Sequence, residues 1–181
     1  LPVWVVPQIF NWAIYKMRDQ PEEFAKSYFP TLEEMRAIAL YAAMLGAKGF
    51  VFYSNFDICQ RYEQVLPGSG IAEREWAKVV EMVKSVKELE PFILSTKKPL
   101  EIAVESEPKD VVEAGALLDD QENYRIIVIG TKGKAKGVFT LPESLTKLKN
   151  EPLCSKFGKT KPLGNGKYEF ITESVDSDIL Y

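Results

Sequence analysis

The chain has 181 residues, of which 46% are hydrophobic and 27% charged, and its formal net charge is −3. This composition is typical of a soluble globular protein, and the charge excludes a basic surface for nucleic acid. Histidine is absent, which excludes Ser-His-Asp and Cys-His catalysis and most catalytic zinc sites. Any chemistry must therefore use carboxylates, Tyr, Lys or Arg.

Targeting and redox signals are weak in this sequence. The longest apolar run, Ala37–Leu45, is too short to cross a bilayer, and no secretory signal is evident. The first residue is Leu1 rather than Met, so we expect a processed product or a fragment. Cys59 and Cys154 fit neither a zinc motif nor a disulfide framework. We expect unpaired thiols, no metal and no cofactor.

Two apolar stretches near the N-terminus predict parallel strands. Val3–Ile9 and Gly49–Ser54 are short apolar and aromatic runs, typical of strands that are buried on both faces. Between them, Thr31 begins a capping-box pattern and Gly46 ends a run of apolar residues with helical spacing. This order predicts a βαβ unit. A second helix is predicted over about Glu73–Glu90, with one apolar face formed by Trp76, Val79, Val80, Val83 and Val86.

The second half of the sequence predicts short antiparallel strands. Pro99–Ser106 alternates apolar and polar residues, as a half-buried strand does. Val112–Leu118 and Tyr124–Gly130 predict a hairpin around a polar turn. Short strands at such spacing are typical of a β-sandwich. Further strands are predicted at Gly137–Leu141, Lys167–Thr172 and Ser177–Tyr181.

The lengths of the connections indicate where a site would lie. The segments that follow the two N-terminal strands are long and aromatic, whereas the return from helix to strand is short. In parallel α/β folds the site lies at the carboxyl ends of the strands. Aromatic rings pack against sugar faces, while amide and carboxylate groups bind hydroxyls. The alternatives are that the polar residues only cap strands and that the rings form a domain interface. The candidate residues are Gln8, Asn11, Trp12, Tyr53 and Asp57.

A family resemblance lies in three segments: PVWVVPQIFNW, PTLEEMRAIALYAAMLGAKGFVFYSNFD and EWAKVVEMVKSVKELEPFIL. They resemble the last two βα units of a (β/α)8-barrel glycoside hydrolase, over about Pro2–Leu94. The pattern PT-EEMR–A–A–GA-G–FYS is typical of bacterial glycosidase-like proteins. The tail resembles the small C-terminal β-sandwich that often follows such barrels.

The resemblance implies an α/β plus all-β fold. A partial (β/α)8 TIM-barrel segment would occupy residues 1–94, and a small antiparallel β-sandwich residues 95–181. Val3–Ile9 and Gly49–Ser54 would be the seventh and eighth barrel strands, with the first six missing. Because part of a barrel cannot close its own sheet, we expect an upstream barrel segment or a second copy to cover the open edge.

The resemblance also sets the functional expectations. In one large clan of these enzymes a nucleophilic Glu ends the seventh strand, but here that end is Gln8–Asn11, without a Glu. We therefore expect the catalytic carboxylates upstream and the five candidate residues to bind carbohydrate. The expected function is the C-terminal portion of a glycoside hydrolase acting on a poly- or oligosaccharide, without nucleic-acid or membrane partners. The family's polysaccharide substrates imply a periplasmic or extracellular location.

Two alternatives to the hydrolase interpretation stay open. The first is a non-catalytic carbohydrate-binding or protein-interaction module that uses the aromatic residues. The second is a self-contained α/β domain with an unrelated small ligand. Two parallel strands make a small sheet for an independent domain, which disfavours the second alternative.

Overall fold

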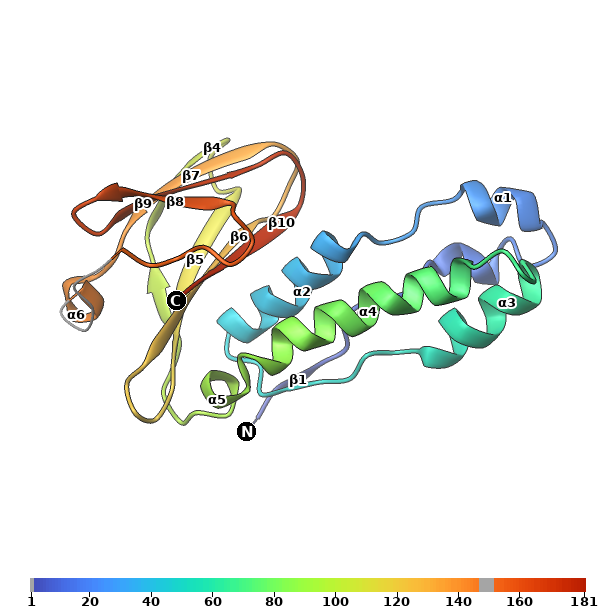
Figure 1. The fold of residues 1–181 in the computed structure, drawn as a ribbon, viewed down its shortest axis with the longest axis horizontal. Coiled ribbons are helices and arrows are strands. Elements are labelled where there is room, and N and C mark those ends of the chain that lie inside the picture. The colour runs from blue at the N-terminus through green and yellow to red at the C-terminus, as the bar shows by residue number, and fades with distance from the viewer. Residues whose placement is uncertain (1, 147–151) are drawn as a thin grey trace.

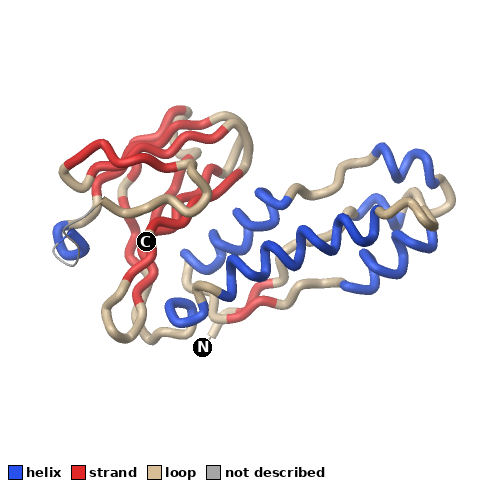
Figure 2. Tube along the Cα trace, viewed as in Figure 1, coloured by secondary structure: helices blue, strands red, loops and turns tan. Residues whose placement is uncertain are grey.

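The computed structural model describes residues 2–146 and 152–181. Helices gather in the N-terminal half and strands in the C-terminal half, and the two halves lie side by side (Figure 1, Figure 2). The helical segments are η1 (Trp12–Tyr15), α1 (Pro21–Lys26), α2 (Leu32–Met44), η2 (Phe56–Arg61), α3 (Tyr62–Val65), α4 (Ile71–Lys87), α5 (Glu90–Ile93) and α6 (Glu143–Thr146). None of the helices in these described ranges is long and apolar enough to span a membrane.

The strands form one parallel pair and two antiparallel sheets within the described ranges. The fold therefore mixes helices with antiparallel sheets, as the broad fold class predicted. The strands are β1 (Trp4–Val5), β2 (Gly49–Phe50), β3 (Leu100–Ile102), β4 (Val104–Glu107), β5 (Val112–Leu118), β6 (Tyr124–Gly130), β7 (Ala135–Thr140), β8 (Thr160–Gly164), β9 (Lys167–Thr172) and β10 (Asp176–Leu180).

The N-terminal half contains the predicted strand–helix–strand unit. β1 and β2 pair in parallel, with Trp4 opposite Gly49, and α2 lies between them in sequence. An isolated parallel bridge between Gln8 and Tyr53 continues the pairing. The strands themselves are shorter than predicted, because regular pairing covers two residues on each side.

One face of this parallel pair is open to solvent, so the prediction of burial on both faces is wrong. Trp4 and Val6 are each 64% exposed, and Val51 beside them is 48% exposed. On the other face Phe50 and Phe52 pack against the helical core, with their rings stacked 6.0 Å apart. Successive side chains point to opposite faces of a strand, so helices cover one face while the described chain leaves the other bare.

Helix α2 begins and ends where the sequence predicts. The backbone N–H of Glu34 donates to the Thr31 hydroxyl at 3.1 Å, and the Thr31 N–H donates to the Glu34 carboxylate at 2.9 Å. This capping box satisfies amides that the first turn would otherwise leave unpaired. At the other end Gly46 has a φ of +93°, the left-handed conformation that ends helices at glycine.

Helix α4 also forms as predicted, with a slightly different buried face. The buried residues include Val79, Met82 and Val86, which are three and four positions apart and therefore share one face of the helix. Val80 was predicted to face inward, but it is 40% exposed. The buried stripe runs through Met82 instead, because residues three and four apart share a helix face.

The helices and the C-terminal strands share one apolar core. Helix α2 packs against α4 and also against β5, β6 and β10. The buried cluster that contains Leu40 of α2 and Met82 of α4 also contains Ile127, Ile129 and Ile179 from the sheet. The sheet of order β10-β6-β5-β3 therefore supports the helical half directly.

The antiparallel strands form two sheets, of order β10-β6-β5-β3 and β4-β7-β9-β8. The predicted hairpin Val112–Leu118 with Tyr124–Gly130 is confirmed, with Gly115 opposite Ile127. Alternate residues of β6 contribute to two cores. Ile127 lies in the helical core, whereas its neighbour Val128 lies in a second cluster with Phe139 and Phe170 of the other sheet.

Two strand predictions in this half need correction. Pro99–Ser106 is not one strand, because β3 and β4 are separated at Ala103 and pair in different sheets. The chain crosses between the sheets there, and a simple alternation cannot reveal such a change of partner. β8 (Thr160–Gly164) was not predicted, because it is an edge strand with only Thr160 buried and thus has no apolar pattern.

Candidate functional site

The carboxyl ends of β1 and β2 carry the predicted candidate residues. The bridge between Gln8 and Tyr53 places these two residues next to each other beyond the paired strands. The long segments that follow are partly helical. Trp12 begins η1, and Phe56 begins η2, a π-helical segment. Short helices thus hold the polar and aromatic side chains of both connections.

Five aromatic side chains form what we call the aromatic surface: Phe10, Trp12, Tyr15, Tyr53 and Phe56. The ring centroid of Phe10 lies 4.7 Å from that of Trp12 and 6.3 Å from that of Tyr53. The Trp12 and Tyr15 rings are 5.7 Å apart. Phe10 is buried, but Trp12 is 56% and Tyr53 54% exposed. Phe10 thus supports rings whose outer faces are open to a ligand.

Asp57 lies beneath this surface as a buried carboxylate that is only 1% exposed. Its carboxylate accepts a hydrogen bond from the Tyr15 hydroxyl at 2.7 Å and another from the hydroxyl of Ser54. A cis peptide bond joins Tyr53 to Ser54. The Arg61 Nε lies 3.1 Å from the same carboxylate. Asp57 therefore holds an aromatic ring and a guanidinium group in place, and it does not face solvent itself.

Arg61 links Asp57 to two rings of the aromatic surface. Its guanidinium carbon lies 4.6 Å from the Tyr15 ring centroid and 5.2 Å from that of Phe56. Stacking of a planar guanidinium on aromatic faces is favourable and restricts its orientation. The Arg61 side chain is 30% exposed, so part of the guanidinium reaches the surface.

Asn11 has a structural position. Its side-chain oxygen accepts from the Ala13 N–H at 2.9 Å, as an N-cap residue does, and its amide donates to the Ser27 hydroxyl at 2.6 Å. The residue is 4% exposed. Asn11 thus orients the segment that carries Trp12, and it does not reach the open surface. Gln8, by contrast, is exposed.

The structure adds Arg61 to the candidate residues and shows that Tyr15 and Ser54 both donate hydrogen bonds to Asp57. Arg61 follows Asp57 by four residues, a spacing at which helical side chains meet. That spacing was visible in the sequence, but the segment was predicted as a loop. In a loop, a spacing of four residues does not indicate that two side chains meet. The contact between Tyr15 and Asp57 spans 42 residues and required the fold.

Two pKa values near the site bear on its chemistry. The hydrogen bond to Asp57, followed by burial, raises the pKa of the Tyr15 phenol. Tyr15 is thus held neutral as a hydrogen-bond donor. Burial is also the main cause that raises the pKa of the Cys59 thiol. A raised pKa disfavours the thiolate, so Cys59 lacks the character of a nucleophile.

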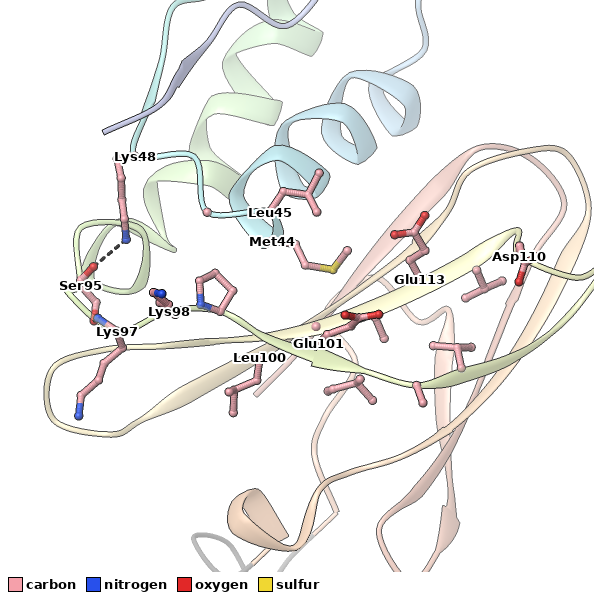
Figure 3. A pocket seen from close by; sticks show the side chains of 18 of the residues that line it. Met44, Leu45, Lys48, Ser95, Lys97, Lys98, Leu100, Glu101, Asp110 and Glu113 are labelled. Carbon is pink, nitrogen blue, oxygen red and sulfur yellow. Dashed lines mark hydrogen bonds between the residues drawn. The ribbon is translucent and has the colours of Figure 1, made fainter. Parts of the chain in front are cut away.

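A cavity of about 820 Å³ lies elsewhere, between the end of α2 and strands β3 and β5 (Figure 3). Figure 3 shows lysines at one end and carboxylates at the other. The Lys48 amine donates to the Ser95 carbonyl at 2.7 Å, and the Tyr41 hydroxyl donates to the Glu113 carboxylate at 2.9 Å. These polar groups connect the two halves of the chain, which is a structural role. We therefore place the candidate site at the aromatic surface and not in this cavity.

Neither a metal site nor a comparison with known proteins identifies a function for this chain. Within residues 2–146 and 152–181, no group of three His, Cys, Asp or Glu side chains could hold a metal ion. A scan against protein-family models, a search of curated proteins and a search of solved structures each found no match to this chain. The geometry of the site is therefore the basis for assigning a function.

Proposed function

We propose that this chain is the C-terminal part of a (β/α)8-barrel glycoside hydrolase-like protein that acts on a poly- or oligosaccharide. In this proposal β1, α2, β2 and α4 are the last two βα units of the barrel. The two antiparallel sheets are a β-sandwich that buttresses them. The parallel pairing of β1 with β2 and the packing of α2 on the sheet support this arrangement.

The observation that carries the proposal is the exposed aromatic surface at the carboxyl ends of two parallel strands. Trp12, Tyr15 and Tyr53 are each between 45% and 56% exposed. Adjacent exposed aromatic side chains form a contiguous apolar patch, and such patches can mark binding sites. The apolar faces of sugar rings fit such rings, and the exposed amide of Gln8 can bind a hydroxyl.

Hydrolysis needs further residues, which we propose lie upstream of this chain. Glycosidases use two carboxyl groups that flank the scissile bond, about 5–10 Å apart. Asp57 is buried and its oxygens already bind Tyr15, Ser54 and Arg61, so it fits a positioning role. The alternative proposal follows from the same observation. A surface without a free carboxylate suits a non-catalytic carbohydrate-binding or protein-interaction module.

The open face of the β1–β2 pair supports a polypeptide partner. Apolar side chains on this face are exposed to water, at Trp4, Val6 and Val51. Further strands would bury them. We propose that an upstream barrel segment or a second copy of the chain covers this face. A periplasmic or extracellular location is part of the proposal, because polysaccharide substrates are found there.

Binding of neutral oligosaccharides by the 181-residue chain tests the proposal. Isothermal titration calorimetry with cello-, manno- and laminari-hexaose should show heat for at least one sugar. Trp12→Ala should weaken that binding about tenfold, equivalent to about 1.4 kcal/mol, because it removes an exposed ring of the surface. Tyr181→Ala is the matched control, since Tyr181 is an exposed aromatic residue at 47% in the other half of the chain.

The outcomes separate the interpretations. Binding that Trp12→Ala weakens about tenfold and Tyr181→Ala preserves supports a sugar site at the aromatic surface. A wild-type chain that binds neither these sugars nor their carboxylated forms, or a Trp12→Ala variant that binds as well as wild type, overturns it. Chromatography with light scattering then reports whether the chain is a dimer, which coverage of the open face by a second copy requires.

A further inference from the structure

We infer that Arg61 recognises a carboxylate group on the sugar, so that the aromatic surface binds acidic oligosaccharides such as uronates. This inference rests on the proposed function, because it requires a sugar on the aromatic surface. It goes further by naming the substrate class and the residue that selects it.

The Arg61 guanidinium forms an ion pair with the Asp57 carboxylate through its Nε side. Nε lies 3.1 Å from the Asp57 carboxylate, and Asp57 is itself held by Tyr15 and Ser54. A guanidinium carries five N–H donors in a rigid fork, and Nε contributes one of them. Across the described ranges, Asp57 is the one ion-pair partner that Arg61 has. The donors of the terminal nitrogens thus stay free for a ligand.

The two aromatic neighbours orient the free donors. The guanidinium lies over the Tyr15 ring at 4.6 Å and near the Phe56 ring at 5.2 Å. Both rings are 45% exposed, and the Arg61 side chain is 30% exposed. The donors are therefore held at the rim of the aromatic surface before any ligand binds. Such preorganisation lowers the entropic cost of binding.

The exposed member of the Arg61–Asp57 ion pair is the cation, which favours an anionic ligand over a cationic one. Asp57 is 1% exposed and lies below the rings, so a ligand at the surface meets the guanidinium and not the carboxylate. Tyr15, the other titratable group bound to Asp57, is an uncharged phenol, and its hydrogen bond to Asp57 raises its pKa further. A planar carboxylate matches the guanidinium fork with two parallel hydrogen bonds.

The arrangement fits a uronate in particular. The carboxylate of a hexuronic acid projects from the edge of the pyranose ring, whereas the ring face is apolar. At this site Trp12 and Tyr15 offer flat faces with centroids 5.7 Å apart, and the guanidinium lies against Tyr15. A sugar that stacks on these rings can direct its carboxylate to Arg61. A neutral sugar can use only the stacking.

A matched pair of ligands tests the inference. The neutral hexasaccharide that binds best is compared with the same sugar after oxidation of its primary hydroxyl groups to carboxylates, which preserves the rings and linkages. Calorimetry with the 181-residue chain should show about tenfold tighter binding of the oxidised sugar at low salt. That advantage should shrink as sodium chloride is raised, because an exposed ion pair is screened.

Three variants locate the effect. Arg61→Gln should remove the preference for the oxidised sugar, measured as the ratio of the two dissociation constants on the same variant. Arg61→Lys keeps a cation beside Asp57 but lacks the fork, and it should lose most of the preference. Arg18→Gln is the control, since Arg18 is 68% exposed and its partner Asp19 is 91% exposed. It should keep the full preference.

The results distinguish this inference from the proposed function. If neither form of any sugar binds, the proposed function fails and the inference fails with it. If the neutral sugar binds and oxidation brings no gain, or if Arg18→Gln removes the gain as fully as Arg61→Gln, the inference alone fails. Should Arg61→Gln not fold, the wild-type comparison and Arg61→Lys decide the matter.

Discussion

Replacing Asp57 with alanine should destabilise the chain by about 2–3 kcal/mol. Removing one partner of a fully buried ion pair costs about 3–5 kcal/mol. Two partners of Asp57 can still reach water here, since the side chain of Arg61 is 30% and the Tyr15 residue 45% exposed. This exposure lowers the penalty, because water can replace part of the lost contact. The remaining cost comes from the buried space and from the Ser54 O–H, which loses its acceptor.

Urea unfolding followed by tryptophan fluorescence measures this change. With a slope of about 2 kcal/mol per molar, Asp57→Ala should lower the midpoint by about 1–1.5 M. Asp19→Ala removes an exposed carboxylate from an exposed ion pair and should change stability by less than about 0.5 kcal/mol. A loss for Asp57→Ala no larger than that of Asp19→Ala would refute the reasoning, because it would mean that the buried contacts contribute nothing.

The remaining predictions concern α2 and the Tyr15 phenol. Thr31→Ala should cost about 1 kcal/mol in urea unfolding, because it removes the cap on the Glu34 N–H, whereas Thr31→Ser should stay near wild type. Tyr15→Phe loses the hydrogen bond to Asp57, so wild type should be the more stable protein below about pH 10. Because the folded-state pKa of Tyr15 is raised, this advantage should disappear as pH rises through that pKa. An unfolding difference that is unchanged at pH 11 would contradict the argument.

Elements whose signals lie within a few neighbouring residues were predicted well. The capping box at Thr31, the left-handed Gly46 and the hairpin β5–β6 all depend on local backbone preferences. The parallel pairing of β1 and β2 also followed from the helix between them. Such features survive folding because the tertiary structure agrees with the local preference.

The candidate site was predicted in part. Sequence reasoning placed aromatic and polar residues at the carboxyl ends of two strands, and the structure brings Trp12, Tyr53 and Asp57 into one region. It did not predict that the Asn11 side chain would cap η1 or that Arg61 would stack on Tyr15. Both outcomes depend on which short helices form in the long connections.

The sequence by itself determined the order of the secondary-structure elements: a strand–helix–strand unit, a second helix and a series of short antiparallel strands. Those features follow from capping residues, glycines and apolar periodicity, which act over a few positions. Only the tertiary structure decided that β3 and β4 belong to different sheets, that α2 packs on the sheet and that one face of β1–β2 stays open. It also decided that Asp57 is buried beneath Tyr15 and Arg61. An apolar pattern states that a side chain prefers to be buried, but which partner buries it depends on contacts between residues that are distant in the sequence.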